Sequence, residues 1–242
     1  MKKEKVISNI NPLVFKGVAH RGLWNKDISE NSLNAFQRGI DNNFALEFDV
    51  HLTKDNELVV IHDEELKRLT GKEGIVEHLT LKELQEKYKL LDGQKIPSFV
   101  EVLDLVHEQV PCLVELKVYE KNYKALSKRF LEVIMPRIKD KKNYVFISFD
   151  PRSLVPLKKS GIMRLLLVHR DYQYVFKLSK HFVNGVDLDQ GLFKYKRYQR
   201  YHKRHLVNVW TIQSKEQLDI VKPYVDTVTF DTLDPTIIKE NL

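Results

Sequence analysis

The ends of short apolar runs in this sequence carry side chains that could perform hydrolytic chemistry. They are two histidines, three carboxylates, two cations and a tryptophan: His20, His62, Glu47, Asp49, Glu115, Arg21, Lys117 and Trp210. An imidazole titrates near neutral pH, so it can act as either member of an acid–base pair. Arginine offers a planar fork of donors and lysine a point charge, and both bind phosphate oxygens. The combination favours chemistry on an anionic substrate such as a phosphate ester.

Two pairs of charged residues are each separated by a single residue. Glu47 is followed two positions later by Asp49, and Glu115 by Lys117. In a β-strand this spacing places both members of a pair on one face. Three carboxylates gathered in a partly dry cleft would repel one another unless a cation lay between them. Because their ligands are all oxygens, we expect Mg²⁺ or Ca²⁺ rather than zinc, which leaves the two histidines for proton transfer.

Short runs rich in β-branched and aromatic residues indicate the strands that would position these groups. There are eight such runs: residues 14–20, 44–50, 112–117, 144–149, 163–168, 183–187, 206–211 and 226–231. Segments of helical period lie between most of them, for example 31–42, 99–110 and 123–135. Alternating strands and helices predict parallel strands joined by right-handed crossovers. With an eighth strand at the end of the chain, we expect a TIM-type (β/α)8 barrel whose site lies at the carboxyl ends of the strands.

A ninth run, residues 58–62, follows the second strand too closely for a helical crossover and predicts a short antiparallel β-hairpin that leaves the barrel. The polar segment 64–95 comes next and contains one helix, whose start is marked by Thr80 and by Glu83 three residues later. The chain length of 242 residues suits one such barrel, and no Ser/Gly-rich linker interrupts it. We therefore expect residues 1–242 to form a single domain.

Composition and charge narrow the class of protein. A chain with 43% apolar and 30% charged residues is neither disordered nor membrane-embedded, and a net charge of +7 favours an anionic partner. The single cysteine, Cys112, excludes an intrachain disulfide and a cysteine-based zinc cage, and its apolar surroundings predict a buried thiol. The sequence contains neither a stretch of about 20 apolar residues nor a signal-peptide core, so we expect a cytoplasmic protein.

The order of motifs along the chain resembles that of the glycerophosphodiester phosphodiesterase family. The matching segments include His-Arg-Gly, Glu-Asn-Ser, Glu-x-Asp-Val-x-x-Thr-x-Asp, Val-x-x-His-Asp and Glu-Leu-Lys, at residues 20–22, 30–32, 47–55, 59–63 and 115–117. Further segments at 67–71, 96–103, 148–149 and 210–211 are also similar to the family. Ser29 and Gln213 depart from it, since proline and asparagine are commoner there. An ordered series of this kind is far more specific than any one of its motifs.

The resemblance implies a metal-dependent barrel enzyme that hydrolyses glycerophosphodiesters to sn-glycerol 3-phosphate and an alcohol. It also implies roles for the eight residues named first: catalytic acid and base for His20 and His62, metal ligands for Glu47, Asp49 and Glu115, and substrate binding for Arg21, Lys117 and Trp210. Either histidine could be the base, and the nucleophile is either water or the neighbouring glycerol hydroxyl. An alternative within the family is a lysophospholipase D activity on lysophospholipids.

Other classes of function rest on the basic and aromatic stretch 194–205. Interleaved basic and aromatic residues can bind nucleic acid, and a basic helix can dock on an acidic membrane. However, Tyr195, Tyr198 and Tyr201 recur at helical spacing, so we expect them to pack as one stripe on the barrel. We therefore expect no nucleic-acid partner, and we keep transient contact with an acidic membrane as an alternative. A pseudoenzyme that binds phosphate without turnover is disfavoured by the full set of histidines and carboxylates.

Overall fold

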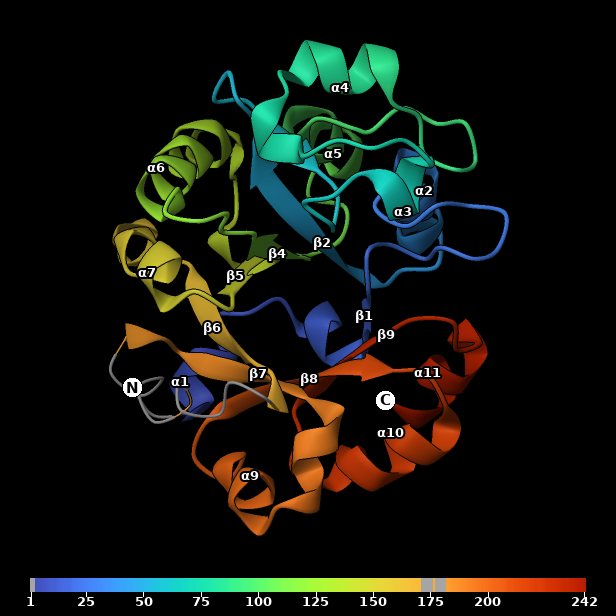
Figure 1. Cartoon of the computed structure of the whole chain (residues 1–242). Coiled ribbons are helices and arrows are strands. Elements are labelled where there is room, and N and C mark those ends of the chain that lie inside the picture. The colour runs from blue at the N-terminus through green and yellow to red at the C-terminus, as the bar shows by residue number, and fades with distance from the viewer. Residues whose placement is uncertain (1–2, 171–175, 177–181) are drawn as a thin grey trace.

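The computed structural model describes residues 3–170, 176 and 182–242. In these residues nine strands form one sheet, in the order β1-β9-β8-β7-β6-β5-β4-β2-β3, and β1 also pairs with β2. Eight parallel strands therefore close into a barrel with the helices on its outside (Figure 1), while β3 lies beyond the barrel. The predicted TIM-type barrel is confirmed.

The strands match the eight apolar runs and the ninth short run of the sequence. Their bounds are β1 (Val18–Ala19), β2 (Ala45–Leu52), β3 (Leu58–Val60), β4 (Cys112–Leu116), β5 (Tyr144–Ser148), β6 (Met163–Val168), β7 (Gly185–Asp189), β8 (Leu206–Ile212) and β9 (Thr227–Phe230). The first strand is much shorter than expected because residues Pro12–Lys16 form a 3-10 turn, which the Asn11 side chain caps by accepting a hydrogen bond from the Leu13 amide.

Helices lie where the helical periods predict them, with shorter bounds. They are α1 (Lys3–Ile7), α2 (Leu33–Asp41), α3 (Lys67–Thr70), α4 (Leu81–Lys87), α5 (Phe99–Val106), α6 (Tyr123–Ile134), α7 (Pro151–Leu154), α9 (Lys196–Tyr201), α10 (Lys215–Val221) and α11 (Pro235–Asn241). Short 3-10 helices cover Val76–His78, Met135–Arg137, Lys141–Asn143, Pro156–Ser160, Gln190–Lys194 and Lys222–Tyr224. The capping box predicted at Thr80 and Glu83 starts α4. None of the described helices is long and apolar enough to cross a membrane.

Alternating side chains of the strands face two different layers of the barrel. On β2, Leu46, Phe48 and Val50 face the surrounding helices, where the Phe48 ring packs edge-on against Phe36 at 5.4 Å. Ala45 points the other way, into an apolar cluster that also holds residues of β4, β5, β6 and β8. Glu47 and Asp49 are in phase with Ala45, so the strand directs both carboxylates into the barrel.

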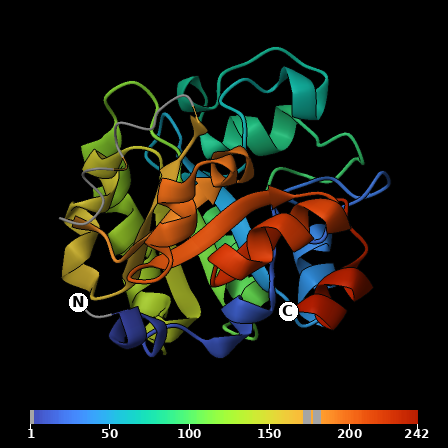
Figure 2. The same ribbon diagram turned by 90° about the horizontal axis from the view of Figure 1, so that it is seen from below.

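The N-terminal segment closes the barrel at the end opposite the site. Val6, Ile10 and Val14 are each at most 3% exposed and belong to the apolar cluster inside the barrel. Figure 2 shows this segment at the far end from the connection that carries α3 and α4. The result is a barrel that is filled with hydrophobic side chains below the layer of charged groups.

The hairpin and the connection after it form an outlying lobe above the barrel. Strand β3 pairs antiparallel with β2, with Val60 opposite Val50, so the predicted hairpin is confirmed. The connection has its own small hydrophobic cluster, which includes Ile61, Leu66 and Leu84. This cluster fixes the chain on either side of His62 and so determines where that histidine lies.

Two other expectations concern buried residues. Cys112 is 1% exposed, and burial raises the pKa of its thiol, which confirms a structural cysteine. The aromatic stripe on α9 is only partly formed: Tyr198 is fully buried and Tyr201 is half-buried, but Tyr195 is 42% exposed. Tyr195 precedes the helix and keeps a ring contact with Tyr198 at 6.4 Å, but its ring also meets the Lys194 amine and the Arg197 guanidinium, so it is not buried on the barrel.

Candidate functional site

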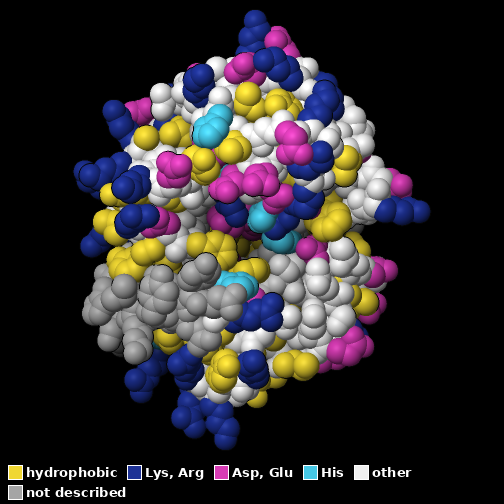
Figure 3. All heavy atoms as spheres, in the orientation of Figure 1, with side chains coloured by type: hydrophobic (Ala, Val, Ile, Leu, Met, Phe, Trp, Pro, Cys, Tyr) yellow, Lys and Arg dark blue, Asp and Glu magenta, His cyan; other side chains and the backbone are white. Residues whose placement is uncertain are grey.

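The carboxyl ends of the barrel strands surround a cavity of about 360 Å³. All but one of the residues singled out in the sequence line it directly, and the remaining one, Asp49, lies just beneath. The lining comprises His20, Arg21, Glu47, His62, Glu115, Lys117, Ile147, Phe149, Leu167, His169, Asp187, Trp210 and Thr229. Figure 3 shows histidines in the middle of this hollowed face, with acidic and basic side chains beside them. The sequence prediction that these groups converge is therefore correct in its geometry.

Three carboxylates form a buried cluster at one side of the cavity. Glu47, Asp49 and Glu115 are 3%, 1% and 6% exposed, and each offers an oxygen within 4.8 Å of the others. Asp49 lies opposite Glu115 in the parallel pairing of β2 and β4, which explains why two short spacings far apart in sequence meet. Burial and the neighbouring carboxylates raise the pKa of Glu47, and burial raises that of Glu115. Burial and mutual repulsion therefore oppose the simultaneous ionisation of all three carboxyl groups.

Two cations partly compensate this charge. Lys117 Nζ lies 3.0 Å from Glu115 Oε1 and 3.6 Å from Asp49 Oδ1, and Arg21 Nε lies 3.7 Å from Asp49 Oδ2. Burial alone would raise the pKa of Asp49, but Lys117, His62 and Arg21 hold it well below its usual range. Asp49 is therefore the member of the cluster that stays ionised most firmly.

The His-Arg-Gly segment is held by its backbone. Arg21 has a φ of +58°, and its amide donates a hydrogen bond to Glu47 Oε2 at 3.0 Å. Gly22 follows with a φ of +80°, and a Cβ there would lie 2.8 Å from the Ala35 carbonyl carbon. Glycine is required at this position because the chain both turns left-handed and passes against helix α2. This tight turn directs the Arg21 side chain into the cavity.

His20 is oriented by a residue from the other end of the chain. Its Nδ1 atom is hydrogen-bonded to Asp231 Oδ2 at 3.0 Å, and its Nε2 atom lies 3.9 Å from Glu47 Oε2. Gln213 donates a hydrogen bond to the second Asp231 oxygen at 3.0 Å. Burial lowers the pKa of His20, although Asp231 opposes the shift. Asp231, one of the predicted strand ends, thus gains a clear partner.

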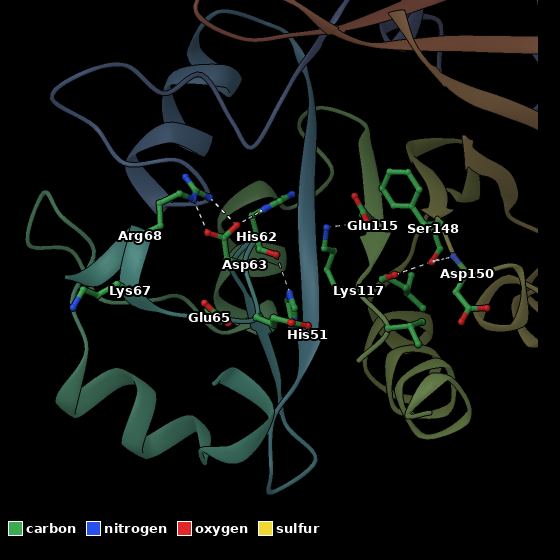
Figure 4. Close-up of a pocket in the computed structure, with 14 residues that line it drawn as sticks. His51, His62, Asp63, Glu65, Lys67, Arg68, Glu115, Lys117, Ser148 and Asp150 are labelled. Atoms are coloured by element: carbon green, nitrogen blue, oxygen red, sulfur yellow. Dashed lines mark hydrogen bonds and ion pairs between the residues drawn. The ribbon is translucent and has the colours of Figure 1, made fainter. Parts of the chain in front are cut away.

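His62 is oriented by its neighbour Asp63. The Nδ1 atom of His62 lies 2.6 Å from Asp63 Oδ1, and Arg68 binds the same carboxylate through Nε at 2.5 Å (Figure 4). Arg68 also donates to Glu30 Oε1, which accepts a second hydrogen bond from Arg21 Nη1 at 2.7 Å. Burial lowers the pKa of His62. A continuous chain of charged hydrogen bonds therefore connects His62 with Arg21.

Asn31 is a buried residue of the site that the sequence analysis treated only as part of a motif. Its side-chain amide donates a hydrogen bond to Asp49 Oδ2 at 2.8 Å, and it is 1% exposed. Its φ of +54° is a left-handed conformation that asparagine tolerates better than most residues. The sequence feature that could have indicated Asn31 is the Glu-Asn pair directly before Ser32, the N-cap of α2.

The opposite wall of the cavity is largely apolar. The Trp210 ring packs edge-on against Phe149 with 5.6 Å between centroids, and its Nε1 atom donates a hydrogen bond to the backbone oxygen of Asp187 at 3.3 Å. His169 lies over the same indole at 6.1 Å, and its Nε2 atom is 3.5 Å from Asp189 Oδ2. The cavity therefore has a charged side and an aromatic side.

The sequence of residues 20–234 matches the glycerophosphoryl diester phosphodiesterase family. A glycerophosphodiester phosphodiesterase of Caldanaerobacter subterraneus subsp. tengcongensis is 33% identical over 59% of this chain and 61% of its own length. A lysophospholipase D of Homo sapiens is 31% identical over 55% of this chain and 43% of its own length. The chain thus matches about half of the length of these relatives.

Solved structures share the fold over nearly the whole chain. A phosphodiesterase of Oleispira antarctica, solved with the product sn-glycerol-3-phosphate, has a TM-score of 0.81 and 22% identity, covering 93% of this chain and 94% of that one. A glycerophosphodiester phosphodiesterase of Thermotoga maritima has a TM-score of 0.74 and 27% identity, covering 92% and 95%. Since the family match extends over residues 20–234 of 242, this chain belongs to the glycerophosphoryl diester phosphodiesterase family.

Proposed function

We propose that this protein is a metal-dependent phosphodiesterase that hydrolyses glycerophosphodiesters to glycerol 3-phosphate and an alcohol. One observation carries the proposal: two imidazoles, each hydrogen-bonded through Nδ1 to an aspartate, line the same cavity as a carboxylate cluster and two cations. An aspartate at Nδ1 orients the ring and supports its protonated form. Nε2 is then the atom of each ring that exchanges protons with the substrate.

The carboxylates Glu47, Asp49 and Glu115 are the residues that would hold a divalent cation. Their oxygens lie within 4.8 Å of one another, and a cation would offset the burial, and the repulsion by neighbouring carboxylates, that raise the pKa values of Glu47 and Glu115. A set of oxygen ligands suits Mg²⁺ or Ca²⁺. When bound, the ion would supply positive charge that lowers the cost of forming negative charge on the phosphate oxygens.

Arg21 and Lys117 would bind the phosphate. Both side chains are about 15–17% exposed, and both face the cavity beside the carboxylate cluster. A phosphodiester is an anion that repels nucleophiles, so these two cations would neutralise its nonbridging oxygens and stabilise the charge that grows in the transition state. The Glu30–Arg68 pair would keep Arg21 in place while the substrate binds.

The two histidines would divide the proton transfers. One imidazole accepts the proton of the attacking oxygen, and the other protonates the departing alkoxide. If water attacks, this step gives glycerol 3-phosphate and the alcohol directly. If the neighbouring glycerol hydroxyl attacks, it gives the alcohol and a cyclic phosphate, which water opens in a second step. Burial lowers the pKa of both rings, which increases the neutral fraction that serves as a base. Trp210 and Phe149 would cover the carbon skeleton of the substrate on the aromatic side.

The test is an assay of glycerol 3-phosphate released from glycerophosphodiesters, with Mg²⁺, with Ca²⁺ and with a chelator. We expect release with at least one of the ions and its loss with the chelator. The matched control for the catalytic histidines is His78→Ala, because His78 is an exposed histidine outside the cavity. Undiminished hydrolysis in the chelator would contradict the metal role of the carboxylate cluster, and no hydrolysis under any condition would reject the function.

A second candidate is a lysophospholipase D activity. The observation that favours it is the apolar wall of the cavity, where Phe149 is 37% exposed and could contact an acyl chain. The same assay run with lysophospholipids, with release of the head group as the readout, separates the two. Hydrolysis of lysophospholipids at a rate equal to or above that of deacylated diesters would make this candidate the main activity.

Contact with an acidic membrane also stays a prediction, as does a cytoplasmic location. The basic stretch 194–205 includes helix α9, whose Lys196 and Arg200 are exposed on the flank of the barrel. Anionic lipid attracts such clusters at low ionic strength. Sedimentation with vesicles of neutral or anionic lipid, with and without salt, tests this; equal sedimentation with both lipids would count against it.

A further inference from the structure

The aromatic side of the cavity contains a carboxyl group that the proposed chemistry does not use. Asp187 on β7 lines the cavity and is 1% exposed. Its Oδ1 atom has no hydrogen-bond partner among residues 3–170, 176 and 182–242. The Trp210 indole donates its hydrogen bond to the backbone oxygen of Asp187 and not to Oδ1. A buried polar atom of this kind is rare in folded proteins and calls for a partner from outside the chain.

The neighbouring strand does not satisfy the Oδ1 atom. Asn208 lies opposite Asp187 in the pairing of β7 with β8, and its side-chain amide donates a hydrogen bond to Thr229 Oγ1 at 2.8 Å. The Asn208 amide also partly offsets the rise that burial causes in the pKa of Asp187, but Oδ1 stays without a partner among the described residues. Asn208 Oδ1 is itself buried and finds no partner in the described part of the chain. Two unpartnered acceptors therefore lie side by side inside the barrel, and one of them belongs to a residue that lines the cavity.

The surroundings of Asp187 restrict what can reach it. Ile147, Leu167 and Trp210 supply an apolar wall in the same cavity of about 360 Å³, and the phosphate-binding cations stand on the opposite side. A ligand that joins the two sides needs an anionic group at one end, a short carbon skeleton, and a hydroxyl at the other end. Glycerol esterified to phosphate has this arrangement.

We propose that Asp187 determines specificity by hydrogen-bonding the free terminal hydroxyl of the substrate's glycerol. The proposal rests on the proposed function and narrows it. Burial raises the pKa of Asp187 to about 8, so at neutral pH the carboxyl group can also donate a hydrogen bond to the hydroxyl oxygen. A fatty acyl ester on that oxygen would remove the donor and place a long chain beside Asp187 in a cavity of about 360 Å³. The cavity thus selects deacylated glycerophosphodiesters over lysophospholipids that carry the acyl group at the terminal position.

The test compares two substrates on one enzyme. Glycerophosphocholine is paired with the phosphocholine diester of propane-1,2-diol, which lacks the terminal hydroxyl but keeps the hydroxyl next to the phosphate. A site built to hydrogen-bond a hydroxyl rejects the analogue that lacks it strongly, so we expect kcat/KM to fall by at least about 100-fold. Asp187→Leu removes the polar group at similar volume. In this variant the ratio of kcat/KM for glycerophosphocholine to kcat/KM for the propanediol analogue should fall below about 10. Asp187→Asn keeps an acceptor and a donor and should retain much of the discrimination.

Two controls keep the outcome clear. Asp219→Asn changes an exposed aspartate on α10 and should leave the ratio unchanged. If Asp187→Leu does not fold, as judged by circular dichroism, the ratio of the two kcat/KM values in the wild type still tests whether the site recognises the terminal hydroxyl. Similar rates for the two substrates in the wild type, or an unchanged ratio in a folded Asp187→Leu, would overturn the proposal while leaving the proposed function intact. Failure of the wild type to hydrolyse any glycerophosphodiester would instead overturn the function and this inference with it.

Discussion

His51 donates a hydrogen bond from Nε2 to the backbone oxygen of His62 at 3.0 Å. A carbonyl oxygen can only accept, so the direction of this bond is fixed. The other ring nitrogen of His51 lies 2.6 Å from Glu77 Oε1, and the His51 side chain is 3% exposed. This buried residue therefore anchors the backbone of His62, at the start of the connection that carries Asp63 and Arg68.

The first prediction concerns that anchor. Replacing His51 with Leu keeps the volume but removes both hydrogen bonds, so kcat should fall by about 10-fold or more, with a smaller change in KM, because His62 is no longer held in position. Unfolding in urea should show a loss of about 1–3 kcal/mol, since Glu77 stays buried without its partner. His51→Gln, which can still donate to the His62 oxygen, should recover part of kcat. A kcat in His51→Leu equal to that of the wild type would show that the anchor has no role in turnover.

The catalytic histidines give a second prediction. His20→Ala and His62→Ala should each lower kcat on the order of 100-fold or more, which is the usual scale for a general acid or base. His78→Ala should leave kcat within about two-fold, because His78 lies outside the cavity. Steady-state kinetics on a glycerophosphodiester measures all three. Near wild-type turnover in either of the first two variants would remove that histidine from the mechanism.

Metal binding gives a third prediction, with a readout that does not depend on activity. Mg²⁺ or Ca²⁺ at about 100 times its dissociation constant should raise the free energy of unfolding by about 2.7 kcal/mol, because the ion binds the folded state. Asp49→Asn and Glu115→Gln should abolish most of the rise, and Asp219→Asn should keep it. Thermal unfolding with each ion and with a chelator measures the effect. An equal shift in Asp49→Asn would place the ion elsewhere.

Stability as a function of pH gives a fourth prediction, from Asp187. Burial raises the pKa of Asp187 to about 8 in the folded protein, against the usual 3.8 of an aspartate side chain. Between these two values the folded state keeps a proton that the unfolded state releases, so stability falls as pH rises. Relative to Asp187→Asn, the wild type should lose about 3 kcal/mol between pH 5 and pH 8. Urea unfolding of both proteins at the two pH values measures this; parallel curves would contradict it.

Two glycines with similar backbone conformations give a fifth prediction. Gly22 and Gly71 have φ values of +80° and +74°, but a Cβ on Gly22 would meet Ala35, whereas Gly71 has nothing within 4 Å among the described residues. Gly71→Ala should therefore lower the free energy of unfolding only by the backbone strain, about 1 kcal/mol. Gly22→Ala should cost about 2–4 kcal/mol, because overpacking is added. Equal losses in denaturant unfolding would show that the contact with α2 does not constrain the turn.

The sequence predicts the barrel and most of the cavity because the evidence is local. A spacing of two residues places Glu47 with Asp49 and Glu115 with Lys117, and the barrel makes β2 and β4 neighbours. The capping box at Thr80 is likewise a feature of four consecutive residues. Such patterns need no knowledge of distant parts of the chain.

Other parts of the site depend on distant contacts. Asp231 meets His20 across 211 residues, and Arg68 reaches Glu30 only because the connection after β3 folds over the barrel. The unpartnered Oδ1 atom of Asp187 is also a property of the assembled cavity, since it depends on which side chains of the described residues reach it. No spacing rule along the chain encodes these relationships.

The packing of Val6, Ile10 and Val14 beneath the charged layer has a consequence for turnover. Because these side chains fill the lower end of the barrel, both products of the proposed reaction would leave at the carboxyl ends of the strands, where the substrate enters. Glycerol 3-phosphate that stays bound to the cations of the cavity would then compete with the next substrate for the same site.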